Sequence, residues 1–160
     1  MTEMTLTEGL ITEIRKELDK YPADQKQSAV MAALRIVQDE YRWVSKNIMQ
    51  EIADFLEMPA IHVYEVATFY SMYEHEDVGR HKLCVCSNIS CQLLGSQQVL
   101  DHLKKKTGIG PGETTADGRI SIKEVECLGA CGGAPMMQVD KDYYENLTPE
   151  SIDKILEGLD

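Results

Sequence analysis

The sequence predicts an α+β protein with two parts, an amino-terminal bundle of helices followed by a carboxy-terminal α/β domain. Three observations support this prediction. Apolar residues recur at helical spacing through residues 1–74, a polar segment that contains a glycine covers residues 74–81, and alternating apolar runs typical of strands follow it. We therefore expect a helical domain over residues 1–74 and an α/β domain over residues 75–160.

The first domain is expected to contain four short amphipathic helices that pack as a bundle. Each begins at a recognisable signal, and in chain order these signals are the capping pair Thr5 and Glu8, the capping pair Asp24 and Gln27, Ser45, and Pro59. The residues expected to face the core are Ile11, Ile14, Leu18, Tyr21, Val30, Ala33, Leu34, Val37, Tyr41, Ile48, Ile52, Phe55, Leu56, Val63, Val66, Ala67 and Tyr70.

The second domain is expected to run strand, helix, strand, strand, strand, helix. The strands are predicted within residues 81–86, 119–127, 134–142 and 143–146, and the helices over about residues 90–106, with Leu94, Leu100 and Leu103 inward, and from Thr148 onward. The basic run Lys104 to Lys106 falls in the last turn of the first helix, before Gly108, where cations offset the negative end of the helix dipole.

Four of the five cysteines form two pairs, each within a short loop that follows a predicted strand. Cys86 and Cys91 lie in CSNISC, and Cys127 and Cys131 lie in CLGACGGAP. Four thiolates from two turns are what a 2Fe-2S cluster requires. The spacing therefore favours an iron-sulfur electron carrier, with backbone N–H groups of residues 88–92 expected to point toward sulfur.

Other roles for four cysteines must be weighed beside this one. Structural zinc also takes four cysteines but favours Cys-x-x-Cys, and a disulfide framework is typical of secreted chains, whereas no secretory segment is evident here. Inert core thiols would lie on apolar faces rather than in bent loops. A thioredoxin-type oxidoreductase needs Cys-x-x-Cys before a helix. A Rieske centre needs two histidine ligands. The four histidines lie outside both loops, and we interpret them as residues at the surface or with their hydrogen bonds satisfied; they are His62, His75, His81 and His102.

Charge and motif content disfavour several functions. The formal net charge of -11 argues against nucleic-acid binding, because phosphate contacts draw on clustered lysine and arginine. The loop GIGPGETTADG follows a predicted helix rather than opening one, so it lacks the context of a dinucleotide fingerprint. No apolar stretch approaches the roughly 18 residues of a membrane span. We expect a cytoplasmic protein. Its acidic surface suits a partner with basic patches, and it is equally typical of an exterior that is solvated and has no partner.

Several long motifs, in order over nearly the whole chain, carry a resemblance to a known family. They are YPADQKQSAVMAAL, RWVS and VYEVATFYSMY in the first half, and VCSNISCQLLG, GETTADGRI and ECLGACGGAPMMQV in the second. The sequence resembles the small iron-sulfur subunit of the NADH-oxidising module of respiratory complex I, a thioredoxin-like 2Fe-2S ferredoxin. Ala32 and Asp77 depart from the family pattern, since proline is common at both places, but neither touches the cysteine motifs.

The resemblance implies that Cys86, Cys91, Cys127 and Cys131 ligate one 2Fe-2S cluster. It also implies that the amino-terminal helices dock on a larger subunit that binds FMN and NADH, in the peripheral arm of a membrane-associated NADH:quinone oxidoreductase. Related subunits serve NAD-linked hydrogenases and formate dehydrogenases, which is the alternative parent complex. Reasoning from the residues agrees on the flavin, because a one-electron cluster cannot accept a hydride and the chain has no phosphate-binding glycine loop.

Two finer expectations concern single residues near the loops. Cys84 stands two residues before Cys86, on the same strand face, and is expected to be a small buried residue rather than a ligand. Ala134–Pro135 follows the second cysteine loop, where thioredoxin-like folds often carry a cis proline, and we expect a cis bond there.

Overall fold

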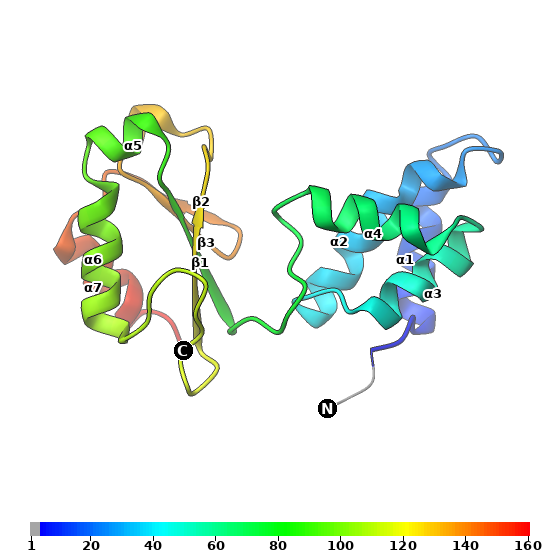
Figure 1. Ribbon diagram of the computed structural model, residues 1–160, viewed down its shortest axis with the longest axis horizontal. Coiled ribbons are helices and arrows are strands. Elements are labelled where there is room, and N and C mark those ends of the chain that lie inside the picture. The colour runs from blue at the N-terminus through cyan, green and yellow to red at the C-terminus, as the bar shows by residue number, and fades with distance from the viewer. Residues whose placement is uncertain (1–3) are drawn as a thin grey trace. The chain divides into compact units, whose positions relative to one another are not determined.

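The computed structural model describes residues 4–160, and the chain divides into two compact units, up to Asp77 and from Val78 onward (Figure 1). The division falls after residue 77 rather than after residue 74, because residues 74–77 are bonded to the helical part. The Val44 N–H donates to the Glu74 carbonyl at 2.8 Å, and the Arg42 guanidinium lies 3.5 Å from the carboxylate of Asp77. The unit boundary therefore follows the last of these contacts.

The first unit is a bundle of four α-helices with one 3-10 turn, which confirms the predicted helical pattern. Its elements are α1 (Glu8–Leu18), η1 (Lys26–Ala29), α2 (Val30–Tyr41), α3 (Lys46–Leu56) and α4 (Ala60–Phe69). The predicted inward stripes form its core, and the largest fully buried side chains are Ile14, Leu34, Ile48, Ile52 and Leu56. Ser45 caps α3 as predicted, since its side chain accepts from the N–H of Ile48.

Two predicted helix starts are wrong. Helix α1 is capped by Thr7 and not by Thr5, because the side chain of Thr7 accepts from the N–H of Leu10 at 3.4 Å. Asp24 caps no helix, since the polar stretch after Pro22 lacks apolar periodicity and forms a 3-10 turn that begins after Gln25 without a side-chain cap. The α-helix that follows starts at residue 30.

Three residues predicted to face the core are exposed, and each lies at or beyond a helix end. Tyr21 follows the last residue of α1, and Tyr70 adopts an extended backbone directly after α4. Leu94 is exposed because the predicted single helix over residues 90–106 is broken at Gly95, whose φ of 104° lies in the left-handed region. Helical periodicity in the sequence therefore continued past the points where the helices end.

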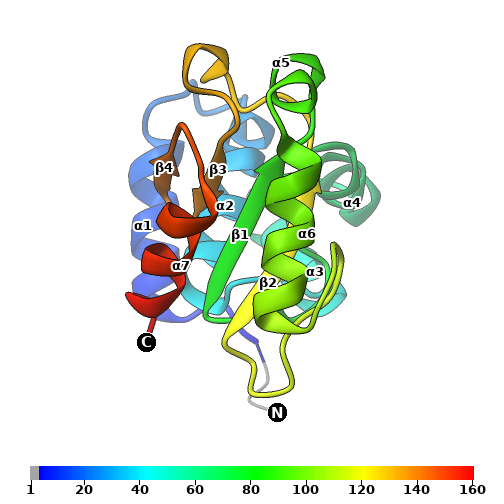
Figure 2. The same cartoon turned by 90° about the vertical axis from the view of Figure 1, so that its left-hand side faces the viewer.

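The second unit contains a four-stranded sheet. Its two longer helices, over residues 96–107 and 149–157, cover one face of that sheet, as Figures 1 and 2 show. The strands lie in the order β2-β1-β3-β4, with β1 parallel to β2 and antiparallel to β3. The elements are β1 (His81–Cys86), α5 (Ile89–Leu93), α6 (Ser96–Thr107), β2 (Ile120–Val125), η2 (Cys131–Gly133), β3 (Met137–Val139), β4 (Asp142–Tyr144) and α7 (Pro149–Glu157). The predicted strand and helix order is confirmed, apart from the break within the first helix.

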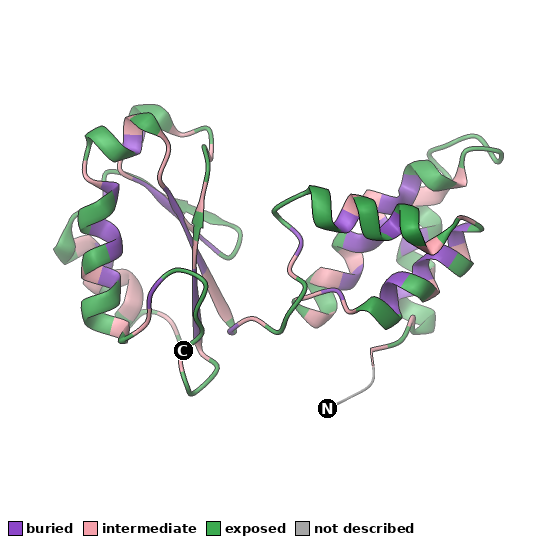
Figure 3. Cartoon of the chain, in the orientation of Figure 1, coloured by how far each residue is buried: buried purple, intermediate pink, exposed green. Residues whose placement is uncertain are grey.

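Helices α6 and α7 pack with the sheet around one core, which Figure 3 shows as the buried stretches of β1 and α6. Its fully buried members include Leu83, Leu103, Ile120, Ile122, Met137 and Ile152. Thr148 and Ser151 form the predicted capping box of α7, and Lys104 to Lys106 occupy the last turn of α6 as predicted. Within residues 4–160, none of the helices combines the length and the apolar character needed to cross a membrane.

Candidate metal centre

Both cysteine loops leave the sheet at the same edge. Cys86 ends β1 and is paired in register with Val125, which ends the parallel strand β2, so the chain segments that follow them start side by side. The Asn88 side chain then donates to the carboxylate of Glu126 at 3.1 Å, joining the two loops. Figures 1 and 2 both place α5 and the segment that precedes β3 at this end of the sheet.

The first pair of thiols is buried. Cys86 and Cys91 are 2% and 1% exposed, and they form a small apolar cluster with Ala134 and Met136. Burial raises the pKa of the Cys91 thiol, and its hydrogen bond with the Cys86 thiol raises that pKa further, while a backbone hydrogen bond from Met136 opposes both. The residue directly before β3 forms the floor of the pair, since the Cys86 N–H also donates to the Met136 carbonyl at 3.3 Å.

The second pair of thiols is exposed. The sulfurs of Cys127 and Cys131 lie 3.6 Å apart, and the Gly129 N–H donates to the Cys127 sulfur at 3.4 Å. Gly129 has a φ of 83°, which only glycine adopts freely, so this tight turn fits the residue found there. The hydrogen bond with the Cys127 thiol is the main cause that raises the pKa of Cys131, and a hydrogen bond from the Ser90 side chain lowers it.

The two pairs act on one another. The second loop packs against the buried pair, because Leu128 and Ala130 contact the cluster that contains Cys86 and Cys91, and the charge of Cys131 adds to the raised pKa of Cys91. The structure therefore brings the two cysteine loops to one site. Thiolates that are brought together repel, and metal cations relieve that repulsion because ligation deprotonates the thiols.

The thiols are arranged as two pairs. Across residues 4–160, no three His, Cys, Asp or Glu side chains are gathered as the ligands of one metal ion would be. Cys127 and Cys131 are in contact, and Cys91 is hydrogen-bonded to Cys86. Two pairs match the donor set of a two-iron centre, in which each iron takes two protein ligands.

Further predictions concerned residues next to the four cysteines. Cys84 is buried within β1, as predicted, and pairs in register with Lys123 of β2 and Gln138 of β3. The Ala134–Pro135 peptide bond is cis, as predicted. The expected N–H groups of residues 88–92 are partly used elsewhere, because the Gln92 N–H donates to the Asn88 carbonyl within α5.

The histidines bond to other groups or lie at the surface. The His81 Nδ1 lies 2.8 Å from a carboxylate oxygen of Asp140, and the His102 Nε2 lies 2.7 Å from one of Asp153. The other two, His62 and His75, are exposed. These positions agree with the interpretation of the histidines as surface or satisfied residues.

Three groups at the site were not identified from the sequence. The Ser90 hydroxyl bonds to Cys131, and its place between Cys86 and Cys91 in the chain was a usable signal. The Met136 backbone acts on Cys91 only because of the register between β1 and β3, for which the sequence carries no signal. Tyr143 also reaches the second loop, where its hydroxyl donates to the Leu128 carbonyl at 2.7 Å.

The sheet topology and the two thiol pairs define a class of protein, a small thioredoxin-like α/β domain able to hold an iron-sulfur centre. Comparison with known proteins agrees. The family model for the thioredoxin-like 2Fe-2S ferredoxin matches residues 14–160. The chain therefore belongs to the thioredoxin-like 2Fe-2S ferredoxin family. This membership makes the cofactor one 2Fe-2S cluster and sets aside the alternative of structural zinc.

Individual relatives extend over most of the chain. A subunit of the NADH-quinone oxidoreductase of Rhizobium meliloti is 43% identical over 147 residues, which cover 92% of this chain and 86% of that protein. A subunit of the NADH-quinone oxidoreductase of Thermus thermophilus is 41% identical over 141 residues, covering 88% and 78% respectively. A solved chain of an NAD+-reducing NiFe hydrogenase shares the fold with a TM-score of 0.70 at 21% identity. That match covers 80% of this chain and only 21% of the longer hydrogenase chain.

Proposed function

We propose that this chain is the electron-transfer subunit of an NADH:quinone oxidoreductase and exchanges an electron with FMN on a partner subunit. The proposal is based mainly on two neighbouring thiol pairs, Cys86 with Cys91 and Cys127 with Cys131, in a member of this family. Relatives that are 43% and 41% identical are named as subunits of that oxidoreductase. The hydrogenase likeness at 21% identity concerns the fold, so an NAD-linked hydrogenase or formate dehydrogenase is the second candidate for the parent complex.

Each residue of the site has a defined task in this proposal. Cys86 and Cys91 supply the buried pair of ligands, and Cys127 and Cys131 supply the exposed pair. The Gly129 N–H, which already donates to the Cys127 sulfur at 3.4 Å, stabilises negative charge on that sulfur. The apolar floor from Ala134 and Met136 keeps water from the buried pair, while the exposed pair remains open to a partner.

The redox chemistry requires a second subunit. A bound 2Fe-2S cluster supplies a one-electron acceptor, whereas NADH releases a hydride, which carries two electrons, so FMN on the partner must take the hydride first. The loop over residues 108–118, which contains a Gly-x-Gly, lies between α6 and β2 and opens no helix, so it offers no dinucleotide site of the strand-turn-helix kind. This chain is accordingly an enzyme subunit that does not oxidise NADH alone.

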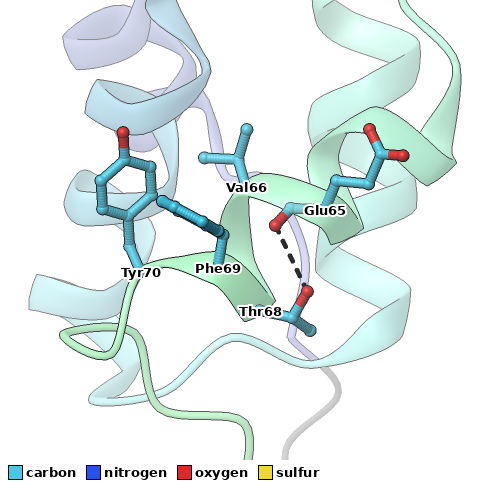
Figure 4. A pocket seen from close by; sticks show the side chains of 5 residues that line it. All are labelled: Glu65, Val66, Thr68, Phe69 and Tyr70. Carbon is cyan, nitrogen blue, oxygen red and sulfur yellow. Dashed lines mark hydrogen bonds between the residues drawn. The ribbon is translucent and has the colours of Figure 1, made fainter.

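The helical unit is assigned to docking on the flavin-bearing subunit. Helix α4 supports this assignment because it carries exposed apolar side chains along its outer side, namely Ile61, Tyr64, Phe69 and the following Met72. A groove of about 430 Å³ lies beside it, lined by Glu65, Val66, Thr68, Phe69 and Tyr70 (Figure 4). Large apolar patches rimmed by polar residues mark protein-protein interfaces. The complex would place the chain in a peripheral arm on the cytoplasmic side of the membrane.

The ligand set and the need for a partner are tested with one preparation. The full-length protein is expected to be brown and to bleach with dithionite, yet to stay oxidised when mixed with NADH alone. Adding the flavin-bearing subunit should then allow NADH to bleach it. Bleaching by NADH without a partner or added flavin would contradict the proposal, and a colourless protein after reconstitution with iron and sulfide would contradict the ligand assignment.

The docking surface is tested by Phe69→Ser. Phe69 is 80% exposed, so the change should leave the fold and the visible spectrum intact while it removes an apolar contact. We expect the dissociation constant for the flavin subunit to rise about tenfold. Tyr21→Ser, which also removes an exposed aromatic ring but follows the end of α1 and does not line the groove, is the control and should bind as the wild type does. Unchanged binding by the Phe69 variant would refute the role of α4.

A further inference from the structure

Helix α5 turns an unusually apolar side toward solvent. Ile89, Leu93 and Leu94 are all exposed, and Leu93 reaches 78%. Single exposed leucines are ordinary, but three exposed large aliphatic side chains within one short helix and its cap are an unusual concentration of apolar surface. We call Ile89, Leu93 and Leu94 the α5 ridge. Its exposure has an energetic cost that neither the fold nor the proposed ligand set explains.

The ridge lies directly over the thiol site. Cys91 belongs to the same helix, and it is 1% exposed while Leu93 is 78% exposed. Residues four apart share a helix face, so Ile89 and Leu93 stand together and Cys91, midway between them in sequence, points to the opposite side. The same short helix therefore presents sulfur inward and aliphatic side chains outward. A surface that covers the ridge approaches to within one helix diameter, about 10 Å, of the buried thiol pair.

The charged groups identified beside this site are carboxylates. The chain carries no charged residue from Cys84 to Leu100, and Glu126 is the only charged residue from 125 to 136. Glu126 accepts from Asn88, the residue that caps α5. Glu145 lies against the second loop, so close that a Cβ on Gly133 would stand 1.9 Å from its carboxylate. Both glutamates are exposed. Negative charge therefore lies beside the cap of α5, at Glu126, and against the second cysteine loop, at Glu145.

We propose that the α5 ridge docks this site against the cofactor-bearing face of the flavin subunit, which presents an apolar hollow bordered by lysine or arginine. This inference rests on the proposed function, because it names the surface through which the redox sites approach. The charges of Glu126 and Glu145 indicate which kind of partner binds this surface. A second copy of the chain would set carboxylates against carboxylates, and an anionic membrane would repel Glu126 and Glu145. A protein surface with an apolar centre and a rim of lysine or arginine can bury the ridge and also pair with the two glutamates.

The ridge is tested in the full-length, cluster-loaded protein. Leu93→Ser is expected to raise the dissociation constant for the isolated flavin subunit about tenfold, which corresponds to about 1.4 kcal/mol, and adding Leu94→Ser is expected to raise it further. Binding is measured by titration calorimetry without NADH. The visible and electron paramagnetic resonance spectra of the free variants should match the wild type, because the exposed side chains do not contact the thiols. If Leu93→Ser fails to load a cluster, Leu94→Ser alone carries the test.

The charged border has its own test. The variant Glu126→Gln with Glu145→Gln should slow association and flatten its dependence on ionic strength. Glu157→Gln removes one carboxylate at the end of α7 and is the control, which should associate as the wild type does. Faster association of the double variant would show that the partner surface is negatively charged and would overturn the proposal.

The outcomes separate this inference from the proposed function. If the wild type does not bind the flavin subunit at all, the proposed function fails. If the wild type binds and the ridge variants bind equally well, the ridge assignment fails while the proposed function stands. If the wild type self-associates and Leu93→Ser abolishes that association, the occupant is a second copy of this chain, and the inference is overturned.

Discussion

Two adjacent glycines after Cys131 provide a matched test of how tightly the second cysteine loop is packed. A Cβ built on Gly133 would lie 1.9 Å from a carboxylate oxygen of Glu145 and 2.7 Å from its Cβ, whereas one built on Gly132 would meet nothing within 4 Å. Neither glycine is among those with positive φ. Gly133→Ala and Gly132→Ala therefore differ in the space around the new methyl group and not in backbone strain.

The magnitude follows from which atoms must move. The carboxylate of Glu145 is exposed and can swing away, but its Cβ moves only with the backbone. That backbone is held, because the Asn146 N–H donates to the Gly133 carbonyl at 2.6 Å. Overpacking of this kind costs about 1–3 kcal/mol. Gly132→Ala should instead be neutral or stabilise by about 0.4–1 kcal/mol, because alanine restricts the unfolded chain. The two variants should differ by about 2 kcal/mol.

Guanidinium unfolding of the cluster-loaded protein measures this difference, followed by visible absorbance for the site and by far-ultraviolet circular dichroism for the fold. If cluster loss makes unfolding irreversible, the half-lives of the visible absorbance at a fixed denaturant concentration are compared instead. Gly133→Ala should lose colour first. Equal midpoints, or equal half-lives, for the two variants would show that Glu145 and the segment after β4 yield freely, and the reasoning from the close approach would be refuted.

Two other predictions concern the fifth cysteine and one histidine. Cys84→Ser should retain the cluster, while Cys131→Ser should lose or badly perturb it, and loss of colour in the Cys84 variant would overturn the ligand set. The hydrogen bond with Asp140 raises the pKa of His81, and the carboxylate of Asp160 3.4 Å from Nε2 adds to this effect. A raised folded-state pKa stabilises below the unfolded value of about 6.5 and loses that contribution as pH rises through the folded value. The stability lost in His81→Gln should therefore be greatest in mild acid and shrink toward alkaline pH, and a pH-independent difference would contradict the pairing.

Local signals in the sequence predicted most of the fold. Ser45 and the pair Thr148 and Ser151 marked helix starts that the structure confirms, because a side-chain oxygen that bonds the first-turn amides acts within a few residues. The errors arise where two local signals compete. Thr5 and Thr7 are both suitable caps, and the choice of Thr7 goes with a contact from 45 residues away, since the Leu6 N–H donates to the Glu51 carboxylate at 2.7 Å.

The site shows the same limit. Spacing predicted the two pairs, and the parallel register of Cys86 with Val125 explains why the loops converge. Spacing does not predict that one pair is buried and the other exposed. That asymmetry depends on Met136, which directly precedes β3 and lies against Cys86 and Cys91, while no strand covers Cys127 and Cys131 among the elements described. Exposure of a motif is decided by long-range pairing.

This asymmetry links the site to its partner. Water now solvates the exposed pair, and a docked subunit would remove that water from a site whose thiols already raise one another's pKa. Removing water from a negatively charged group is costly unless cations or hydrogen-bond donors replace it. A partner that covers this edge must therefore bring positive charge, and Glu126, beside the cap of α5, increases that demand. The apolar α5 ridge gives the partner a surface that can be buried without the removal of water from any further charge. The exposed thiol pair and Glu126 require positive charge on the partner, and the ridge requires an apolar surface. A partner with an apolar contact surface bordered by lysine or arginine meets both requirements.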